Sequence, residues 1–189
     1  MRLFVAVELP ASVITVAAAV SEELRERVAR VAPRARLTWV AADRLHVTLR
    51  FLGQVGDDQA AAIAQALAPP FDVPPFPLGL GDVGTFPGRG APRTVWIALA
   101  RGAEACRSLA GGVSARLDLV GIPREPRLIP HLTLARVREP GGLRGQVLTD
   151  VVVPPHPGGS ADAITLFESR LSSRGPTYTA LQRTPLRGG

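Results

Sequence analysis

Apolar residues recur at helical spacing in two long segments of the chain. In residues 11–31, one broad face carries Val13, Val16, Val20, Leu24, Val28 and Val31. The same pattern returns in residues 103–120. A shorter helix is expected from the candidate N-cap residues Asp57 and Asp58 to about Leu67. The periodicity therefore predicts three amphipathic helices.

Short apolar runs between these segments predict strands. They cover residues 2–9, 37–40, 45–52, 76–83, 94–100, 131–137, 163–171 and 177–181, with a turn around 172–175 joining the last two. Segments 69–77, 84–93 and 154–160 are rich in proline and glycine and are predicted connections; residues 146–153 lead into the last. No glycine-rich dinucleotide loop follows the first strand, which argues against a Rossmann fold. The pattern favours an α+β fold with mainly antiparallel strands.

Composition is that of a soluble globular chain. Its 189 residues are 46% hydrophobic and 20% charged, which suits one domain or two small fused lobes. The apolar stretch 13–20 is too short to cross a bilayer, and no signal peptide is recognisable. The single cysteine, Cys106, excludes an internal disulfide and a cysteine-rich zinc site. We expect a cytoplasmic protein without membrane association.

All 22 basic residues are arginine, and the net charge is +6. Without lysine there can be no lysyl-nucleotide intermediate, no Schiff base and no P-loop lysine. The planar guanidinium group suits phosphate, so the composition is compatible with a nucleic-acid substrate. Compositional drift explains the same bias equally well.

One short motif occurs twice. Residues Leu45–Leu49 read Leu-His-Val-Thr-Leu, and Pro130–Leu134 read Pro-His-Leu-Thr-Leu. The two histidines are 131 − 46 = 85 positions apart; a long amphipathic helix precedes each motif, and Arg50 or Arg136 follows closely. This duplication predicts two related lobes about a pseudo-twofold axis.

Strand geometry places chemistry on one face of each motif. Successive side chains of a strand alternate between faces, so His46 and Thr48 project together, as do His131 and Thr133. Their apolar neighbours point the other way, into a core. Two such strands across a cleft would set two imidazoles on opposite sides of a small substrate.

Two histidines suit phosphodiester cleavage, because histidine titrates near neutral pH. A neutral ring removes a proton from water and a charged ring delivers one to the leaving alkoxide, each worth about 10²–10⁴ in rate. Thr48 and Thr133 can donate hydrogen bonds to phosphoryl oxygens. Structural histidines are the simplest alternative. A two-histidine metal site is another, although no carboxylate or third histidine sits at ligand spacing in either motif.

Four stretches, 2–10, 40–53, 127–136 and 167–178, carry a resemblance to a known family. They resemble, in order, the two-histidine (2H) phosphoesterase superfamily. The similarity is greatest to its RNA 2′,3′-cyclic phosphodiesterase branch, once described as 2′-5′ RNA ligases. Members usually carry an aromatic residue where this chain has Leu128.

The resemblance implies a bilobal LigT-like α+β fold with two pseudo-twofold-related antiparallel sheets, outer helices and a central cleft. Residues 1–189 would then form a single domain of two intertwined lobes. It also implies hydrolysis of 2′,3′-cyclic phosphates at RNA ends to 2′-phosphomonoesters, without metal or cofactor. In this scheme His46 is the proton donor and His131 the proton acceptor. We expect a monomer whose partner is RNA.

Three further residues are candidate substrate contacts. Arg136 matches a family arginine near the phosphate, but strict alternation puts it on the core side unless the strand bulges or ends at Ala135. Arg50 shares the face of His46 and can meet phosphate or remain a solvated rim charge. Tyr178 is a cleft residue by resemblance and otherwise an ordinary strand aromatic.

Other residues have weaker claims. Phe51, Trp39 and Trp96 can stack on a base, although core packing is the simpler interpretation. His156 lies in a loop rich in proline and glycine and is expected to be exposed and without a role. The 84–93 loop, with two arginines, either flanks the cleft or is a surface turn.

Two other functions remain open. One is ATP-independent 2′-5′ RNA ligation, which would join a 2′,3′-cyclic phosphate end to a 5′-hydroxyl. The other is a nucleotide-binding or RNA-binding module without turnover. The physiological RNA is not identified by the sequence.

Overall fold

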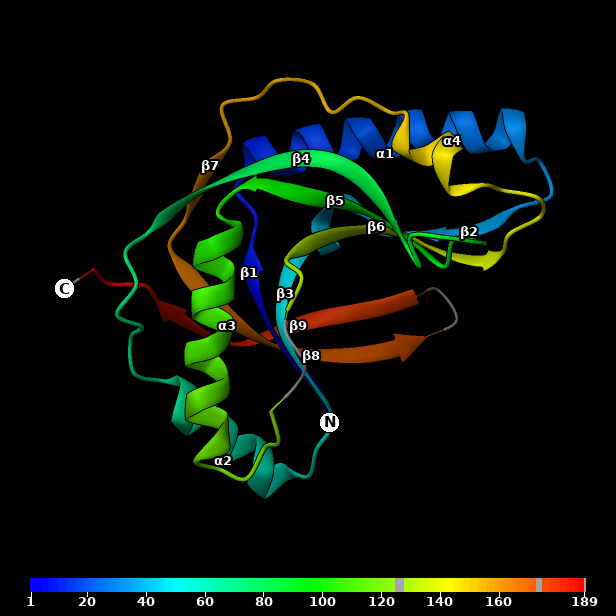
Figure 1. The fold of residues 1–189 in the computed structure, drawn as a ribbon. Helices are drawn as coiled ribbons and strands as arrows, with labels where there is room; N and C mark the ends of the chain where they lie inside the picture. Colours follow the sequence, from blue (N-terminus) through cyan, green and yellow to red (C-terminus); the bar gives the residue numbers. More distant parts are fainter. Residues whose placement is uncertain (125–127, 173–174, 189) are drawn as a thin grey trace.

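The computed structural model describes residues 1–124, 128–172 and 175–188, in which strands alternate with helices (Figure 1). The elements are β1 (Arg2–Glu8), α1 (Ala11–Val31), β2 (Arg36–Trp39), the 3₁₀ turn η1 (Ala42–Arg44), β3 (His46–Gln54), α2 (Asp57–Leu67), β4 (Phe76–Phe86), β5 (Thr94–Arg101), α3 (Ala103–Asp118), β6 (His131–Glu139), α4 (Gly145–Thr149), β7 (Gly159–Ala161), β8 (Ala163–Ser172) and β9 (Gly175–Pro185). Two expected features reach outside the described residues: the 127–136 stretch at residue 127, and the 172–175 turn at residues 173 and 174.

The strands form one nine-stranded sheet in the order β7-β4-β5-β6-β3-β1-β8-β9, with β2 also paired to β6. The named strand pairs are antiparallel. Its two halves meet where β3 pairs with β6 at Val47 and Leu132, both completely buried. The two sheets expected from the sequence are thus two halves of a continuous sheet, and the α+β class is confirmed.

The long helices are exchanged between the two halves. Helix α1 follows β1 of one half but packs on β4 and β7 of the other. Helix α3 follows β5 but packs mainly on β3. Figure 1 shows α1 along β4 at the top of the sheet and α3 beside β1 and β3. Each long helix thus follows a strand of one half of the sheet and packs on the other half.

The helical periodicity located the helices well. The buried stripe of α1 contains Val13, Ala17, Val20, Ser21, Leu24 and Val28. The helix begins after Pro10, whose carbonyl accepts hydrogen bonds from the amides of Val13 and Ile14 at 2.9 and 3.1 Å. Helix α2 spans Asp57–Leu67 and ends as predicted, but its N-cap is Gly56, so the prediction that Asp57 or Asp58 caps it is wrong. No helix among the described residues is both long and apolar enough to span a membrane.

The segment between β6 and β8 contains structure that was not predicted. It holds α4 and the edge strand β7, five and three residues long. The expectation that His156 is exposed and without a role is also wrong. His156 is half-buried, and its Nε2 accepts a hydrogen bond from the Leu80 amide at 2.9 Å. Its ring thereby ties this segment to β4, beside an irregularity in the β4–β5 pairing.

Candidate active site

The two histidines of the repeat lie at the centre of the sheet. His46 opens β3 and His131 opens β6. The two strands pair at Val47 and Leu132. In this antiparallel register His46 lies opposite Thr133, and His131 lies opposite Thr48. Thr48 and Thr133 line one cavity together with His46. The fold therefore brings the four motif residues to one place.

Both imidazoles are held by the same kind of hydrogen bond. His46 Nδ1 donates to the carbonyl of Arg44 at 2.8 Å, and His131 Nδ1 donates to the carbonyl of Ile129 at 2.7 Å. A carbonyl only accepts, so each Nδ1 carries a hydrogen. Each Nε2 is consequently the atom that gains or loses a proton. His46 Nε2 lies 3.1 Å from the Thr48 hydroxyl.

Aromatic rings pack against both imidazoles. The ring centroids of Phe4 and Tyr178 lie 4.9 and 5.4 Å from that of His46. The ring of Phe86 meets His131 edge-on, with centroids 5.2 Å apart. These rings displace water from the imidazoles and fix their orientation. Phe86 ends β4, so the β4–β5 hairpin does flank His131.

Trp96 supports His131 from the β5 side. Its ring stacks on Phe86 at 4.9 Å and lies 6.0 Å from the imidazole of His131. It occupies the space over Gly84, where any side chain would collide with the indole. Glycine at position 84 is therefore required to seat Trp96, which acts as a packing residue.

Burial lowers the pKa of both His46 and His131 from the ordinary value of 6.5, because desolvation disfavours the charged ring. The Nδ1 hydrogen bonds to carbonyls oppose this change and raise the pKa of each. The remaining cause differs between the two rings. Repulsion from His131 lowers the pKa of His46, whereas the guanidinium of Arg136 lowers the pKa of His131.

A β-bulge follows the motif in each strand. Positions 48 and 50 of β3 pair with 6 and 5 of β1, which leaves Leu49 as an extra residue. Positions 133 and 135 of β6 likewise pair with 96 and 95 of β5, and Leu134 is extra. An extra residue reverses the alternation of faces beyond it. Phe51 and Arg136, each five residues after its histidine, therefore return to the cleft face.

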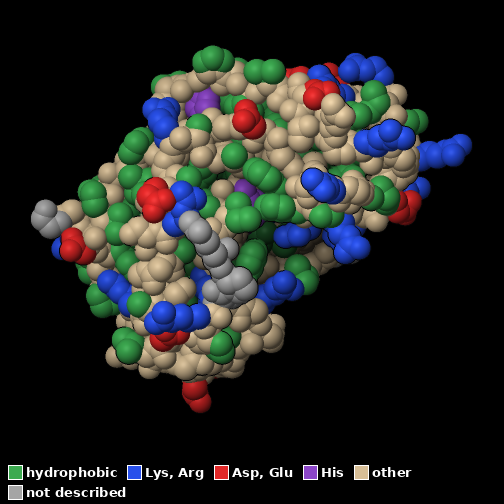
Figure 2. Space-filling view, viewed as in Figure 1, with side chains coloured by type: hydrophobic (Ala, Val, Ile, Leu, Met, Phe, Trp, Pro, Cys, Tyr) green, Lys and Arg blue, Asp and Glu red, His purple; other side chains and the backbone are tan. Residues whose placement is uncertain are grey.

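The central cavity at this face has a volume of about 300 Å³. Its lining includes Arg2, Phe4, Arg44, His46, Thr48, Phe51, Thr133, Arg136, Leu171 and Tyr178. Among the described residues that line it, none is an aspartate or glutamate. Figure 2 shows a hollow near the middle of this side of the molecule, with a histidine and several arginines around it. The arrangement offers guanidinium groups and the Nε2 atom of His46 to an anionic ligand, and the β3–β6 register puts His131 next to Thr48, outside the lining of this cavity.

Sequence comparison identifies the family. The family model described as LigT-like phosphoesterase matches residues 14–96. The RNA 2′,3′-cyclic phosphodiesterase of Archaeoglobus fulgidus is 30% identical over 96% of this chain and 98% of its own length. That of Thermus thermophilus is 34% identical over 100% of this chain and 91% of its own. The chain belongs to the LigT-like phosphoesterases.

Solved structures agree with the assignment of this chain to the LigT-like phosphoesterases. The protein TT0787 of Thermus thermophilus matches with a TM-score of 0.72 and 32% identity, covering 100% of this chain and 99% of its own. Escherichia coli LigT in its apo form matches with a TM-score of 0.67 and 28% identity, covering 98% and 96%. The LigT-like fold expected from the motifs is therefore confirmed.

One residue that the sequence predicts to contact the substrate lies on the face of its strand opposite the cleft. Arg50 was expected beside His46, but only 5% of it is exposed, and its guanidinium donates to the carbonyl of Pro123. It lines a separate cavity with residues of α3 such as Arg107 and Ser114. The bulge at the preceding leucine turns Arg50 away from the cleft, so the predicted face is wrong.

The structure places some of the aromatic candidates in the central cavity and others elsewhere. Phe51 was interpreted mainly as a core residue, yet it is 53% exposed at the central cavity. Tyr178 lies in the cavity, as the resemblance implied. Trp39 packs elsewhere, with the guanidinium carbon of Arg25 5.4 Å from its ring centroid. Of the aromatic candidates, Phe51 and Tyr178 thus line the central cavity.

Two arginines of the cavity were missed at the sequence level. Arg2 comes from the start of β1, and Arg44 ends η1 just before the first motif. Arg44 Nη1 donates to the carbonyl of Pro176 at 2.7 Å, which ties η1 to β9. The run Asp-Arg-Leu-His was a signal for Arg44, since it lies two positions before the motif histidine. No sequence motif near Arg2 indicates a role for it, because Arg2 reaches the cavity only through the pairing of β1 with its neighbouring strands.

Proposed function

We propose that this phosphoesterase opens 2′,3′-cyclic phosphates at RNA ends to 2′-phosphomonoesters, with His46 as the acid and His131 as the base. The observation that carries the proposal is the matched pair of imidazoles. Both have Nδ1 held by a carbonyl and Nε2 available for proton transfer, on either side of the join between the two halves of the sheet.

The proposed reaction is an in-line displacement at phosphorus. His131 Nε2 removes a proton from water as the water oxygen bonds to phosphorus. The bond from phosphorus to the ribose 3′ oxygen breaks, and the Nε2–H of His46 supplies the proton to that oxygen. Arg136 and the hydroxyls of Thr48 and Thr133 stabilise the charged phosphoryl oxygens.

Electrostatics is compatible with this division of roles. Burial lowers the pKa of both histidines, and the positive charge of Arg136 lowers that of His131 further, which favours the neutral form that a base requires. The negative charge of a phosphate bound between the rings raises both pKa values and so favours the protonated form that the acid requires. Within the described residues, no group of three or more His, Cys, Asp or Glu side chains is arranged to hold a metal ion. The acid–base pair needs none.

The relatives support RNA as the substrate. Those cited above are named RNA 2′,3′-cyclic phosphodiesterases. Escherichia coli LigT has been solved in complexes with 3′-AMP, NADP⁺ and phosphate. NADP⁺ carries a phosphomonoester on a ribose 2′ oxygen, the same group that opening of a cyclic phosphate would leave here. The central cavity is of the size that binds small ligands.

An oligonucleotide that ends in a 2′,3′-cyclic phosphate tests the proposal. In the presence of EDTA we expect full conversion to a 2′-phosphate end, because the proton transfers use only side chains. Phosphorus NMR and a 3′-phosphate-specific phosphatase would identify the product. Loss of turnover on chelation, or a 3′-phosphate product, would contradict the mechanism.

The pH dependence follows from the lowered pKa values. In the free enzyme the acid must be protonated, and burial holds the pKa of His46 below 6.5. We therefore expect kcat/KM to fall as pH rises, with its alkaline limb below pH 6.5. Bound phosphate raises the pKa of the acid, so the alkaline limb of kcat should lie at higher pH. Rate profiles from acidic to mildly alkaline pH would measure both; the opposite order of the limbs would refute the assignment.

A further inference from the structure

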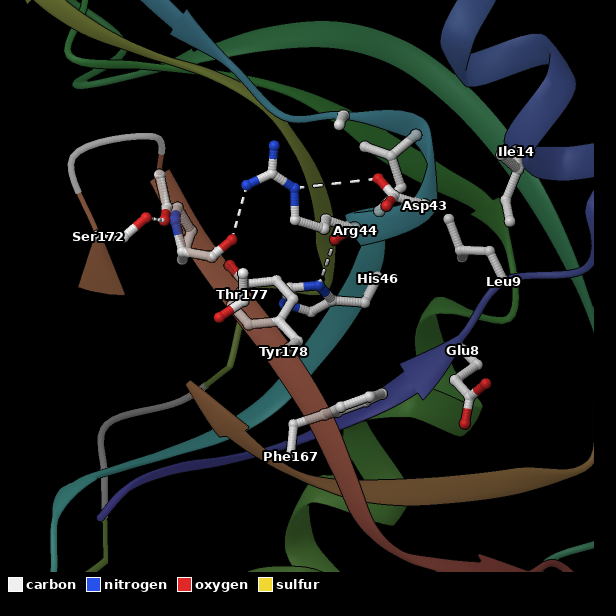
Figure 3. Close-up of a pocket in the computed structure, with 14 residues that line it drawn as sticks. Glu8, Leu9, Ile14, Asp43, Arg44, His46, Phe167, Ser172, Thr177 and Tyr178 are labelled. Carbon is white, nitrogen blue, oxygen red and sulfur yellow. Dashed lines mark hydrogen bonds and ion pairs between the residues drawn. The ribbon is translucent and has the colours of Figure 1, made fainter. Parts of the chain in front are cut away.

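A second cavity, of about 510 Å³, adjoins the central one. We call it the outer cavity. Its walls include Glu8, Leu9, Ile14, Asp43 and Phe167, and it shares Arg44, His46, Pro176 and Tyr178 with the central cavity. Figure 3 shows Arg44, His46 and Tyr178 on one side and Leu9, Ile14 and Glu8 on the other. Because the two cavities share these lining residues, a ligand in the central cavity lies next to the outer one.

The wall between the cavities is organised around Arg44. Its Nη1 donates to the carbonyl of Pro176 at 2.7 Å, and its Nε lies 3.9 Å from the Asp43 carboxylate. Tyr178 stands edge-on to His46, with ring centroids 5.4 Å apart. A guanidinium group thus lies at the boundary, where a chain passing from one cavity to the other would meet it.

The two cavities differ in charge. The described residues that line the central cavity include three arginines, whereas those of the outer cavity include one arginine and the two exposed carboxylates of Glu8 and Asp43. Carboxylates repel phosphate but accept hydrogen bonds from base amino groups and ribose hydroxyls. Leu9, Ile14 and Phe167 add apolar surface on which a base can pack. The outer cavity therefore suits a nucleoside better than a phosphate group.

The position of His46 indicates which nucleoside this is. If His46 protonates the 3′ oxygen, as proposed above, the terminal ribose lies on the His46 side of the central cavity. The rest of the RNA leaves that ribose through its 5′ oxygen. We infer that the outer cavity binds the nucleoside immediately upstream of the cyclic phosphate, with Arg44 beside the phosphate that joins the two nucleosides. This inference rests on the proposed function.

Two substrates separate the contributions of the cavities. One is adenosine 2′,3′-cyclic phosphate, which fills only the central cavity. The other is the adenosine dinucleotide with the same cyclic end. We expect kcat/KM of the wild-type protein to be at least about tenfold higher for the dinucleotide, the gain of one well-packed base with its contacts. This comparison needs no variant and so does not depend on folding.

Filling the outer cavity should remove the advantage. Ile14→Trp places an indole in the cavity from the half-buried face of α1, and we expect the ratio of the two kcat/KM values to fall to near one, with turnover of the mononucleotide retained. Thr15→Trp, on the exposed face of the same turn, is the matched control and should keep the ratio. Asp43→Ala, at a side chain that is 83% exposed, removes an acceptor without repacking and should lower the ratio about threefold.

The outcomes distinguish the two proposals. If the wild type hydrolyses both substrates equally well, or if Ile14→Trp lowers both rates by the same factor, the outer cavity does not bind the upstream nucleoside, although the proposed function stands. If neither substrate is hydrolysed, the proposed function and this inference both fail.

Discussion

Replacing His46 or His131 with glutamine is expected to lower kcat/KM for a cyclic phosphate by at least about 10²–10⁴-fold. Glutamine can still hydrogen-bond but cannot transfer a proton at neutral pH. Each imidazole is half-buried, outside the core, so the change opens no void there. Steady-state kinetics would measure the loss, and thermal unfolding would verify that the fold is retained. Full activity of either variant would contradict the paired-histidine mechanism.

A matched control and a modified substrate sharpen this test. His156→Gln changes the third histidine, which lies just before β7, and should leave kcat/KM unchanged. A cyclic phosphate with sulfur in place of the 3′ bridging oxygen has a leaving group that depends less on protonation. On this substrate His46→Gln should lose far less activity than His131→Gln. The reverse order would exchange the roles of acid and base.

Much of the fold followed from periodicity alone. Helix α2 ends at the predicted residue, and α1 and α3 begin at the predicted residues 11 and 103. The repeated motif also predicted how its own residues lie, because alternation over three residues is enough to put His46 beside Thr48 and His131 beside Thr133. These features depend on short-range geometry, which a sequence carries locally.

The errors arose where long-range pairing decides the structure. Arg50 lies four residues after His46, and strict alternation puts it on the same face. One extra residue, Leu49, reverses that result, yet a leucine in a strand looks the same whether or not it is bulged. The bulge exists only in relation to β1, whose register is not readable from β3. For the same reason, the sequence did not predict that Phe51 lies in the cavity.

Residues assembled from distant segments were the hardest to recognise. Arg2 and Arg44 reach the central cavity from strands and turns whose neighbours are set by the sheet order. His156 supports β4 through an amide 156 − 80 = 76 positions away. Helix α4 and strand β7 are too short to show a period. In each case the partner, not the local pattern, determines the role.

Arg136→Ala is the second substitution with a large expected effect, and the bulges supply its matched contrast. Removing the guanidinium that we propose to contact the phosphate should lower kcat/KM by about 10²–10³-fold, the usual loss for one group that stabilises the developing charge. Arg50→Met, on the opposite face of the sister strand, should leave kcat/KM near wild type. It should instead lower the free energy of unfolding by about 1–3 kcal/mol, because a carbonyl loses its buried donor.

Arg136→Ala should also change the pH profile, which separates an electrostatic role from a structural one. The positive charge of Arg136 lowers the pKa of His131, so its removal raises that pKa. A base with a higher pKa becomes neutral only at higher pH, and the acid limb of kcat/KM should therefore move upward. Arg138→Ala, an exposed arginine two positions later that hydrogen-bonds Thr38, should change neither rate nor profile. An unchanged acid limb in Arg136→Ala would mean that His131 is not the base, or that Arg136 does not act on it.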